Sequence, residues 1–237
     1  MGSIAQTNNG INSKERVKSS GEVFTPDSIV CDMLKLCEDE LKKKCKNNNE
    51  FICSTFLEPA CGDGQFLIRI LSSKLANIQK CKNITNEEKK ILVIKALQSI
   101  YGIDILQDNV EQSKNRMLKI ILGETVTTFD LKNKTNEIQV ELGIDMTSDF
   151  VDKVKETLDT NIMCGDTLKA ENSTHGKLYI RKYEYIDKNK VHIVDIPFDN
   201  LGSEFGAIDI GTYNILDKYG GSSGNSQNYN QDEEYDF

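Results

Sequence analysis

The 237-residue sequence predicts a doubly wound α/β fold with a mostly parallel sheet and a C-terminal hairpin. Short apolar runs that end in polar turns alternate with amphipathic stretches of helical length, as in a parallel sheet covered by helices. Two further segments, 177–186 and 190–194, flank the turn 187–189 and indicate the hairpin. Doubly wound sheets bind ligands beyond the carboxyl ends of their strands, so we expect the functional residues there.

The predicted elements begin with a helix at Thr25-Pro26-Asp27, because proline suits the first turn of a helix. Its apolar stripe fades before Asn47-Asn48-Asn49, where the helix is expected to end. We expect strands at 51–57, 100–105 and 161–164, and further helices at 65–78, 86–98, 108–122 and 148–158. The rest of 123–160 is variable in character and receives no assignment.

The composition divides the chain into three regions. Residues 1–20 are polar and are predicted to form a flexible N-terminal arm. Residues 21–201 carry the alternating elements and make up the predicted domain. Residues 202–237, which include a Gly/Ser/Asn-rich and acidic stretch, are predicted to be a polar, disordered tail.

Charge and cysteine content restrict the classes of function. The net charge is −8 at pH 7, and lysines and arginines bind DNA phosphates, so the chain is not expected to grip DNA unaided. Its seven cysteines include no Cys-x-x-Cys pair, so we expect neither a disulfide framework nor a metal site. No apolar run reaches the roughly 18–20 residues of a membrane span. The start lacks a secretory pattern, and we therefore expect a cytoplasmic protein without membrane contact.

The segment 56–67, Phe-Leu-Glu-Pro-Ala-Cys-Gly-Asp-Gly-Gln-Phe-Leu, carries the strongest functional signal. Gly62 and Gly64 lie between a predicted strand and a predicted helix, so the backbone can turn sharply and a ligand can approach it closely. The helix start offers free N–H groups and partial positive charge to a carboxylate. Glu58 and Asp63 supply negative charge for an ammonium group. S-adenosyl-L-methionine carries both a carboxylate and an ammonium, and it suits this mixture.

This segment resembles the cofactor loop of the N6-adenine-specific DNA methyltransferases of restriction–modification systems, whose usual form is L-E-P-A-C-G-x-G-x-F-L. The resemblance implies a Rossmann-like, S-adenosylmethionine-dependent methyltransferase fold. A lone Gly-x-Gly would indicate only a tight turn, whereas the whole string is far more specific. The similarity covers roughly residues 16–201 and is strongest up to Leu168.

Three further segments occur in the order that this family requires, beginning with Gly21 to Pro26. Asp104 ends the second predicted strand, where a carboxylate can accept both hydroxyl protons of a ribose while Ile105 packs on the adenine. The alternative is a solvated aspartate at a strand end. In the third segment Asp166 would accept a hydrogen bond from the adenine amino group, although Gly-Asp is also a common turn. The resemblance thus implies cofactor contacts from Phe24, Thr25, Glu58, Ala60, Gly62, Asp63, Asp104, Ile105 and Asp166.

Members of the family complete their active site with N/D/S-P-P-Y/F/W after a fourth strand, and no Asn-Pro-Pro-Tyr occurs here. In that motif a polar side chain holds the target amino group and the aromatic ring stacks on the flipped base. The segment 195–198, Asp-Ile-Pro-Phe, fits a relaxed form, which makes Asp195, Pro197 and Phe198 candidate catalytic residues. The residues before it alternate like an exposed hairpin, whereas a central parallel strand is continuously apolar. The alternative is a proline-containing turn at a strand end.

The resemblance implies an S-adenosylmethionine-binding subunit of an adenine-specific DNA methyltransferase, with a partner protein that supplies base and DNA recognition. One alternative is a non-catalytic cofactor-binding module that regulates or blocks restriction. Another is a minimal, self-sufficient N6-adenine methyltransferase that uses the segment 195–198. The sequence leaves open whether this chain alone is an enzyme.

Overall fold

The computed structural model describes residues 25–203 and 205–217. The predicted N-terminal arm, Phe24 and the part of the predicted tail from 218 onward lie outside the described residues. The helices and strands are α2 (Asp27–Lys44), α3 (Asn48–Ile52), β1 (Phe56–Glu58), α4 (Gln65–Gln79), α5 (Asn86–Gln98), β2 (Ile100–Asp104), α6 (Gln107–Ile121), β3 (Val126–Phe129), η1 (Leu131–Asn133), β4 (Thr135–Ile138), α7 (Ser148–Asn161), β5 (Ile162–Asp166), β6 (Glu171–Asn172), β7 (Tyr179–Tyr185), β8 (Lys190–Pro197), η2 (Phe198–Asn200) and β9 (Ile208–Asn214).

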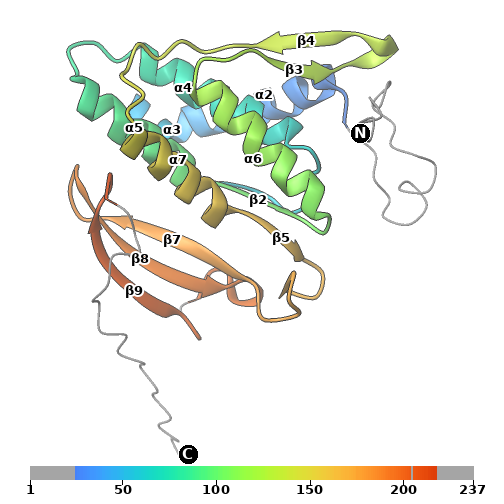
Figure 1. The fold of residues 1–237 in the computed structure, drawn as a ribbon, viewed down its shortest axis with the longest axis vertical. Coiled ribbons are helices and arrows are strands. Elements are labelled where there is room, and N and C mark those ends of the chain that lie inside the picture. The colour runs from blue at the N-terminus through green and yellow to red at the C-terminus, as the bar shows by residue number, and fades with distance from the viewer. Residues whose placement is uncertain (1–24, 204, 218–237) are drawn as a thin grey trace, which may run out of the picture.

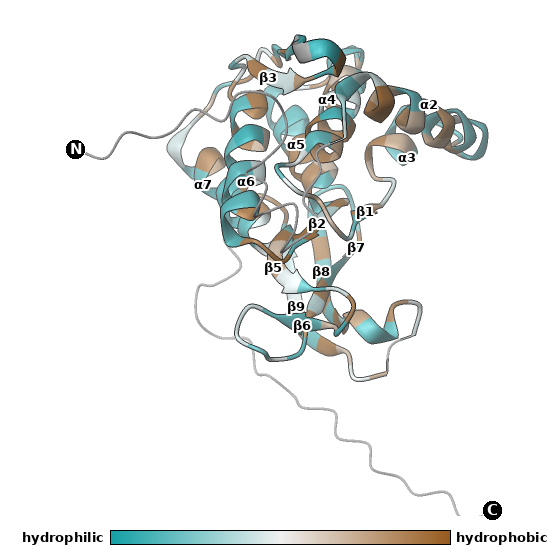
Figure 2. Cartoon of the chain, turned by 90° about the vertical axis from the view of Figure 1, so that its right-hand side faces the viewer, coloured by the Kyte–Doolittle hydropathy of each residue, from teal (hydrophilic) through white to brown (hydrophobic). Residues whose placement is uncertain are grey.

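The central sheet has the strand order β1-β2-β5-β6, in which β1, β2 and β5 are parallel and the short β6 is antiparallel. Helices α4 to α7 cover one face of β2 and β5, and a second sheet lies on the other side (Figure 1). The view in Figure 2 places α2, α3 and β1 on one side of β2 and β5 on the other. A mixed α/β fold with a mostly parallel sheet is therefore confirmed.

The second sheet is antiparallel with the order β7-β8-β9. Its first two strands confirm the predicted hairpin. The third strand corrects the prediction of a disordered tail from residue 202, because Ile208–Asn214 pairs along β8 and Ile215 behind it is buried. The polar composition of this segment concealed the strand. An exposed outer strand can be polar on most of its surface, since pairing with β8 satisfies its backbone.

The predicted strand at 51–57 is wrong in its first half. Residues Asn48–Ile52 form the helix α3, which begins because the side chain of Asn47 accepts a hydrogen bond from the N–H of Glu50. Only Phe56–Glu58 forms β1. Short apolar runs do not distinguish a buried helical turn from a buried strand, because both hide the same side chains.

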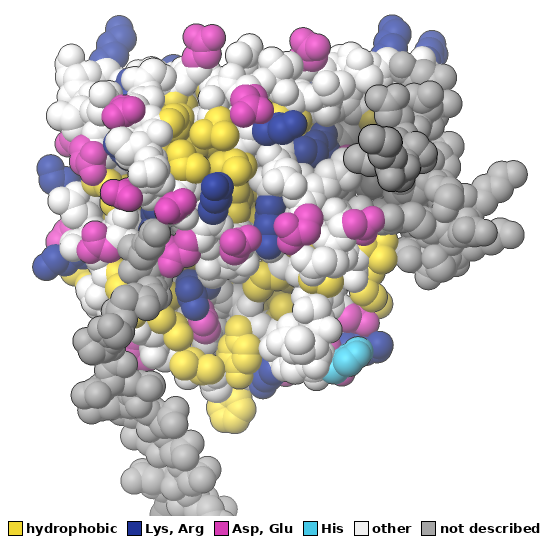
Figure 3. Space-filling view, in the orientation of Figure 1, with side chains coloured by type: hydrophobic (Ala, Val, Ile, Leu, Met, Phe, Trp, Pro, Cys, Tyr) yellow, Lys and Arg dark blue, Asp and Glu magenta, His cyan; other side chains and the backbone are white. Residues whose placement is uncertain are grey.

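The side chains of β2 point alternately into two apolar cores, and all five of its residues are buried. Ile100 belongs to the core under the helices. Tyr101 and Ile103 face the other way and pack with Leu178 and Ile180 from the antiparallel sheet. The central strand thus holds both layers together. On the face shown in Figure 3, acidic and basic side chains are interspersed and form no continuous basic surface.

Lys74 of α4 is fully buried and connects the start of β1 to the start of β2. Its ammonium donates hydrogen bonds to the carbonyl oxygens of Ile52 at 2.8 Å and Ser54 at 2.5 Å, and to Ser99 Oγ at 2.6 Å. Burial disfavours the charged form and lowers the pKa of Lys74 from 10.5 to about 7. The three acceptors compensate part of the cost of burying this side chain.

The buried Lys74 makes stability depend on pH. Its folded pKa of about 7 lies below the ordinary value of 10.5, so the folded state binds fewer protons between these limits. The free energy of unfolding should therefore rise with pH in this window, by at most about 1.4 kcal/mol per pH unit. Urea denaturation from pH 6 to 10 should show this rise in the wild type and a weaker one in Lys74→Met. Lys153, whose pKa burial lowers to about 8, contributes equally to both proteins, so parallel curves would contradict the prediction.

Candidate functional site

The parallel strands β1, β2 and β5 end at one edge of the sheet, and each ends in a carboxylate: Glu58, Asp104 and Asp166. The loops beyond them touch, since Thr167 Oγ1 donates to the carbonyl oxygen of Pro59 at 3.2 Å. The structure thus brings together three strand ends, the first and last of which lie more than a hundred residues apart in the sequence. This edge holds most of the residues predicted to bind a cofactor.

The loop between β1 and α4 depends on two glycines. Gly62 and Gly64 have φ angles of 53° and 86°, in the left-handed region that residues other than glycine rarely adopt. The N–H of Gly64 donates to the carbonyl oxygen of Cys61 at 2.9 Å, and Gly64 itself precedes the first residue of α4. Ser113 Oγ on α6 donates to the carbonyl oxygen of Gly62 at 2.9 Å. The turn is therefore held from within and by a neighbouring helix.

Asp104 ties this loop to the end of β2. Its Oδ2 accepts a hydrogen bond from the N–H of Gly62 at 2.9 Å. Its Oδ1 accepts from the N–H of Leu106 at 2.9 Å and from Asn109 Nδ2 at 3.2 Å. A carboxylate has about four lone-pair directions, so a ligand hydroxyl can take a remaining one. Because Asp104 is buried and accepts three hydrogen bonds, the alternative of a solvated strand-end aspartate does not describe it.

Two groups at this edge face outward beside Asp104. Glu58 is half-buried, and burial raises the pKa of its carboxyl while the N–H of Ala60, 3.4 Å from Oε1, opposes that rise. Ile105 exposes 59% of its surface directly after the Asp104 carboxylate. An exposed apolar side chain next to a hydrogen-bonding carboxylate suits a planar ring attached to a sugar.

Asp63 has a different environment from the other predicted acids. Its Oδ2 lies 2.6 Å from Arg116 Nη1 in an ion pair that is mostly buried. Arg116 also donates to Gln65 Oε1 at 2.7 Å and to the carbonyl oxygen of Thr127 at 3.0 Å. Asp63 therefore anchors the loop to α6, and its charge is neutralised within the protein. Sequence reasoning missed Arg116, because no local pattern connects residues 53 positions apart.

Asp166 lies in the turn after β5. Its Oδ1 accepts hydrogen bonds from the backbone N–H groups of Leu168 at 3.0 Å and Lys169 at 3.2 Å, and Lys169 Nζ lies 3.3 Å from Oδ2. The side chain thus stabilises its own turn. This is the arrangement expected of a common Gly-Asp turn, the alternative raised in the sequence analysis. A ligand that engaged Asp166 would compete with these local partners.

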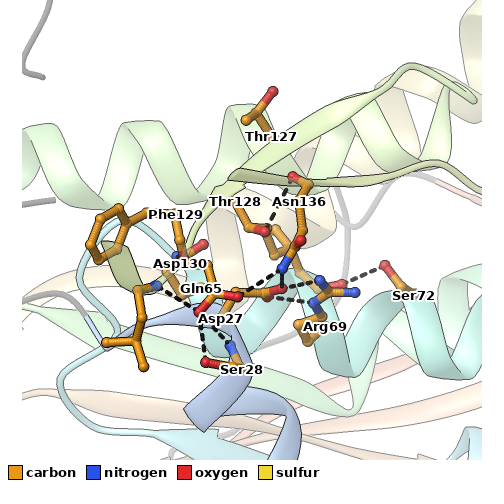
Figure 4. A network of polar contacts seen from close by, with 12 residues as sticks. Asp27, Ser28, Gln65, Arg69, Ser72, Thr127, Thr128, Phe129, Asp130 and Asn136 are labelled. Carbon is orange, nitrogen blue, oxygen red and sulfur yellow. Dashed lines mark hydrogen bonds and ion pairs between the residues drawn. The ribbon is translucent and has the colours of Figure 1, made fainter. Parts of the chain in front are cut away.

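Thr25 is half-buried immediately before α2, and the first turn of that helix is held firmly in place. Asp27 is 1% exposed and accepts hydrogen bonds from Arg69 Nε at 2.6 Å and from Asn136 Nδ2 at 2.7 Å, with a second bond from Arg69 Nη2 (Figure 4). Burial would raise the pKa of Asp27, but the bonds from Arg69 and Asn136 outweigh it and keep the pKa below its ordinary value. Thr25 is thus attached to a rigid helix start.

The hairpin β3–β4 completes this network, and the sequence did not predict it. Ser28 Oγ donates to Asp130 Oδ1 at 2.6 Å, and Gln65 Nε2 donates to the carbonyl oxygen of Phe129 at 3.3 Å. The hairpin therefore joins the first residues of α2 and α4 (Figure 4). Its strands, four residues each, are too short to give a clear alternation in the sequence.

The predicted catalytic segment occupies the end of an antiparallel strand. Asp195 of β8 forms two hydrogen bonds to Arg181 of β7, both 2.8 Å long. Pro197 lies opposite Tyr179, and Phe198 packs against the second apolar core. The segment does not follow a parallel strand next to β1, and its position matches the alternative of a proline-containing turn at a strand end.

Two cavities of similar size lie beside the helices in the described part of the chain. One of about 520 Å³ is enclosed by α6, α7, β5 and β7, and its lining includes Arg181 and Asp195. Another of about 550 Å³ lies between α2, α4 and β4. Neither is lined by Glu58, Gly62 or Asp104.

Cys61 of the loop packs into the apolar core. Its side chain is 6% exposed, and burial raises the pKa of its thiol to about 12. The glycine at 102 makes room for it, since a Cβ there would lie 3.2 Å from Cys61 Sγ and 2.6 Å from Leu67 Cδ1. The loop and α4 can therefore press closely on β2.

The glycine loop can be tested by a matched pair of substitutions. In Gly64→Ala the new Cβ would lie 2.8 Å from Ser113 Oγ and 3.1 Å from Ser113 Cα, at a φ of 86°. Gly143 has a φ of 60° and nothing within 4 Å, so Gly143→Ala incurs only backbone strain of about 1–2 kcal/mol. We expect Gly64→Ala to lower the free energy of unfolding by about 1–3 kcal/mol more, because of the overlap. Equal losses in urea denaturation would show that α6 does not constrain the loop.

In the described part of the chain, no group of three or more His, Cys, Asp or Glu side chains is placed to hold a metal ion. Within the same residues, no helix has the length and apolar character needed to cross a membrane. Comparison with protein-family models, with curated proteins and with solved structures gave no match to this chain.

Proposed function

We propose that the chain is the S-adenosyl-L-methionine-binding subunit of an adenine-specific DNA methyltransferase of the restriction–modification type. A partner protein would supply target-base and DNA recognition. The observation that carries the proposal is the meeting of the glycine loop with Glu58, Asp104 and Ile105 at one edge of the sheet. The assignment to a Rossmann-like methyltransferase fold is part of the same proposal. The three parallel strands of the described sheet are compatible with such a fold.

The residues at this edge match the groups of the cofactor. The half-buried carboxylate of Glu58 would balance the ammonium, and N–H groups near the start of α4 would receive the carboxylate. Asp104 would accept hydrogen bonds from the ribose hydroxyls, and Ile105 would pack on the adenine. The left-handed turn at Gly62 leaves the backbone accessible to the ligand. When bound, the cofactor supplies a sulfonium methyl group for transfer.

Two observations favour a partner over a self-sufficient enzyme. Asp195 is paired with Arg181, and the half-buried Phe198 packs against an apolar core, so both side chains already have partners within the antiparallel sheet. The net charge of −8 and the interspersed charges in Figure 3 offer no broad basic surface for DNA on that face. The same observations fit a non-catalytic cofactor-binding module, which would differ only in transferring no methyl group with any partner.

Calorimetric titration of S-adenosyl-L-methionine into the full chain tests the cofactor site. We expect binding by the wild type, and affinity about tenfold or more weaker in Ile105→Asp, because a charge replaces the apolar contact. Ile105 is 59% exposed, so its substitution should leave the thermal midpoint unchanged. Asp104→Asn should also weaken binding, whereas the exposed control Asp145→Asn should not. A folded wild type that binds no cofactor would refute the site.

The segment 195–198 separates the partner-dependent proposal from the self-sufficient enzyme. We expect Asp195→Asn and Phe198→Ala to lower the thermal midpoint and to leave cofactor affinity unchanged, since both side chains support the antiparallel sheet. The wild-type chain alone should transfer no labelled methyl group to adenine-containing DNA. Methylation by the isolated wild type that is lost in a folded Phe198→Ala variant would instead establish the self-sufficient enzyme.

A further inference from the structure

Strand β1 is the edge of the parallel sheet, and among the described residues it pairs with β2 alone. The N–H of Phe56 donates to the carbonyl oxygen of Ser99 at 2.8 Å. Because backbone groups of successive strand residues point to opposite sides, the N–H and C=O of Leu57 point away from β2. The Leu57 side chain is 39% exposed, whereas all of β2 is buried. The outer side of β1 therefore presents unpaired backbone groups beside a partly exposed apolar side chain, as a strand does when a neighbouring strand is missing.

Helix α2 has an apolar flank on the same side of the molecule. Ile29, Met33 and Leu36 recur at helical spacing and are 41%, 50% and 72% exposed. The other flank, with Lys35 and neighbouring residues, lines the cavity against β4. Figure 2 places α2 and β1 on one side of β2. The unpaired strand edge and the exposed flank together form what we call the β1 docking surface: Ile29, Met33, Leu36 and Leu57.

We infer that the β1 docking surface binds an extended segment of a partner polypeptide, which adds a strand to β1 and lays apolar side chains on α2. A helix could cover the flank of α2, but it would leave the N–H and C=O of Leu57 without backbone partners among the described residues. A strand satisfies both requirements, because main-chain hydrogen bonds and alternate side chains act together in this mode of binding. The direction of the strand rests on the proposed function. A parallel strand would end at the edge that holds Glu58 and Asp104, where the partner must act.

Selection from a displayed library of random peptides against the immobilised full chain tests this inference and does not require the partner to be identified. We expect enriched sequences rich in β-branched and aromatic residues. A synthetic peptide of the enriched sequence should slow hydrogen exchange at the amide of Leu57 and leave the exchange of β9 unchanged. The double substitution Met33→Asp with Leu36→Asp should weaken its binding at least about tenfold. The control Ile186→Asp, at a 60% exposed residue of the antiparallel hairpin, should have no effect.

Three results would overturn the inference: no enriched peptide protects Leu57, protection survives the double substitution, or the chain alone sediments as a dimer that the double substitution dissociates. The last would assign the surface to a second copy of this chain. Cofactor titration of the same double variant keeps the two proposals separate, because Met33 and Leu36 lie outside the glycine loop and affinity should equal that of the wild type. Peptide binding without cofactor binding would support the β1 docking surface and refute the proposed function. Cofactor binding without peptide binding would support the proposed function and refute the docking surface.

Discussion

The hydrogen bond from the Gly62 N–H to the Asp104 carboxylate is the contact on which the candidate site depends. It joins the loop after β1 to the end of β2, so separating the two strand ends would break a hydrogen bond to a buried carboxylate. The loop can come this close because Gly102 has no side chain and leaves room for Leu67 and Cys61. Loop, helix start and strand end therefore form one rigid unit before any ligand is present. A ligand that bound there would lose little energy in ordering the protein.

Two arginines pair with some of the acidic residues around this unit, and the remaining acidic residues are left to interact with a ligand. Arg116 neutralises Asp63, and Arg69 neutralises Asp27 at the start of α2. Both pairs are largely buried, so removing one partner would leave an uncompensated charge inside the protein. Glu58 and Asp104 are held by N–H groups and have no ion pair among the described residues. The negative charge offered to a ligand is thus concentrated at the ends of β1 and β2.

The antiparallel sheet covers the second face of the central strand β2. Tyr101 and Ile103 of β2 bury their side chains against this sheet, which occupies the face opposite the helices. Asp195, which is paired with Arg181, and the half-buried Phe198 belong to this sheet and to the turn that follows it. On the other side β1 keeps an unpaired edge in the described part of the chain. The arrangement stabilises the edge that holds Glu58 and Asp104, and it leaves the outer side of β1 without a paired strand among the described residues.

The sequence by itself determined the glycine loop, the strand-end carboxylates Glu58 and Asp104, and most helices, because these features depend on local spacing and backbone conformation. It failed for α3, the hairpin β3–β4 and β9, since short or polar segments take their structure from the neighbours that pair with them. Only the tertiary structure decided that Asp63 faces Arg116, that Asp195 faces Arg181 and that Ile105 faces outward. Which residue a side chain contacts across the fold depends on how distant elements pack, and the spacing of residues along the chain does not encode that packing.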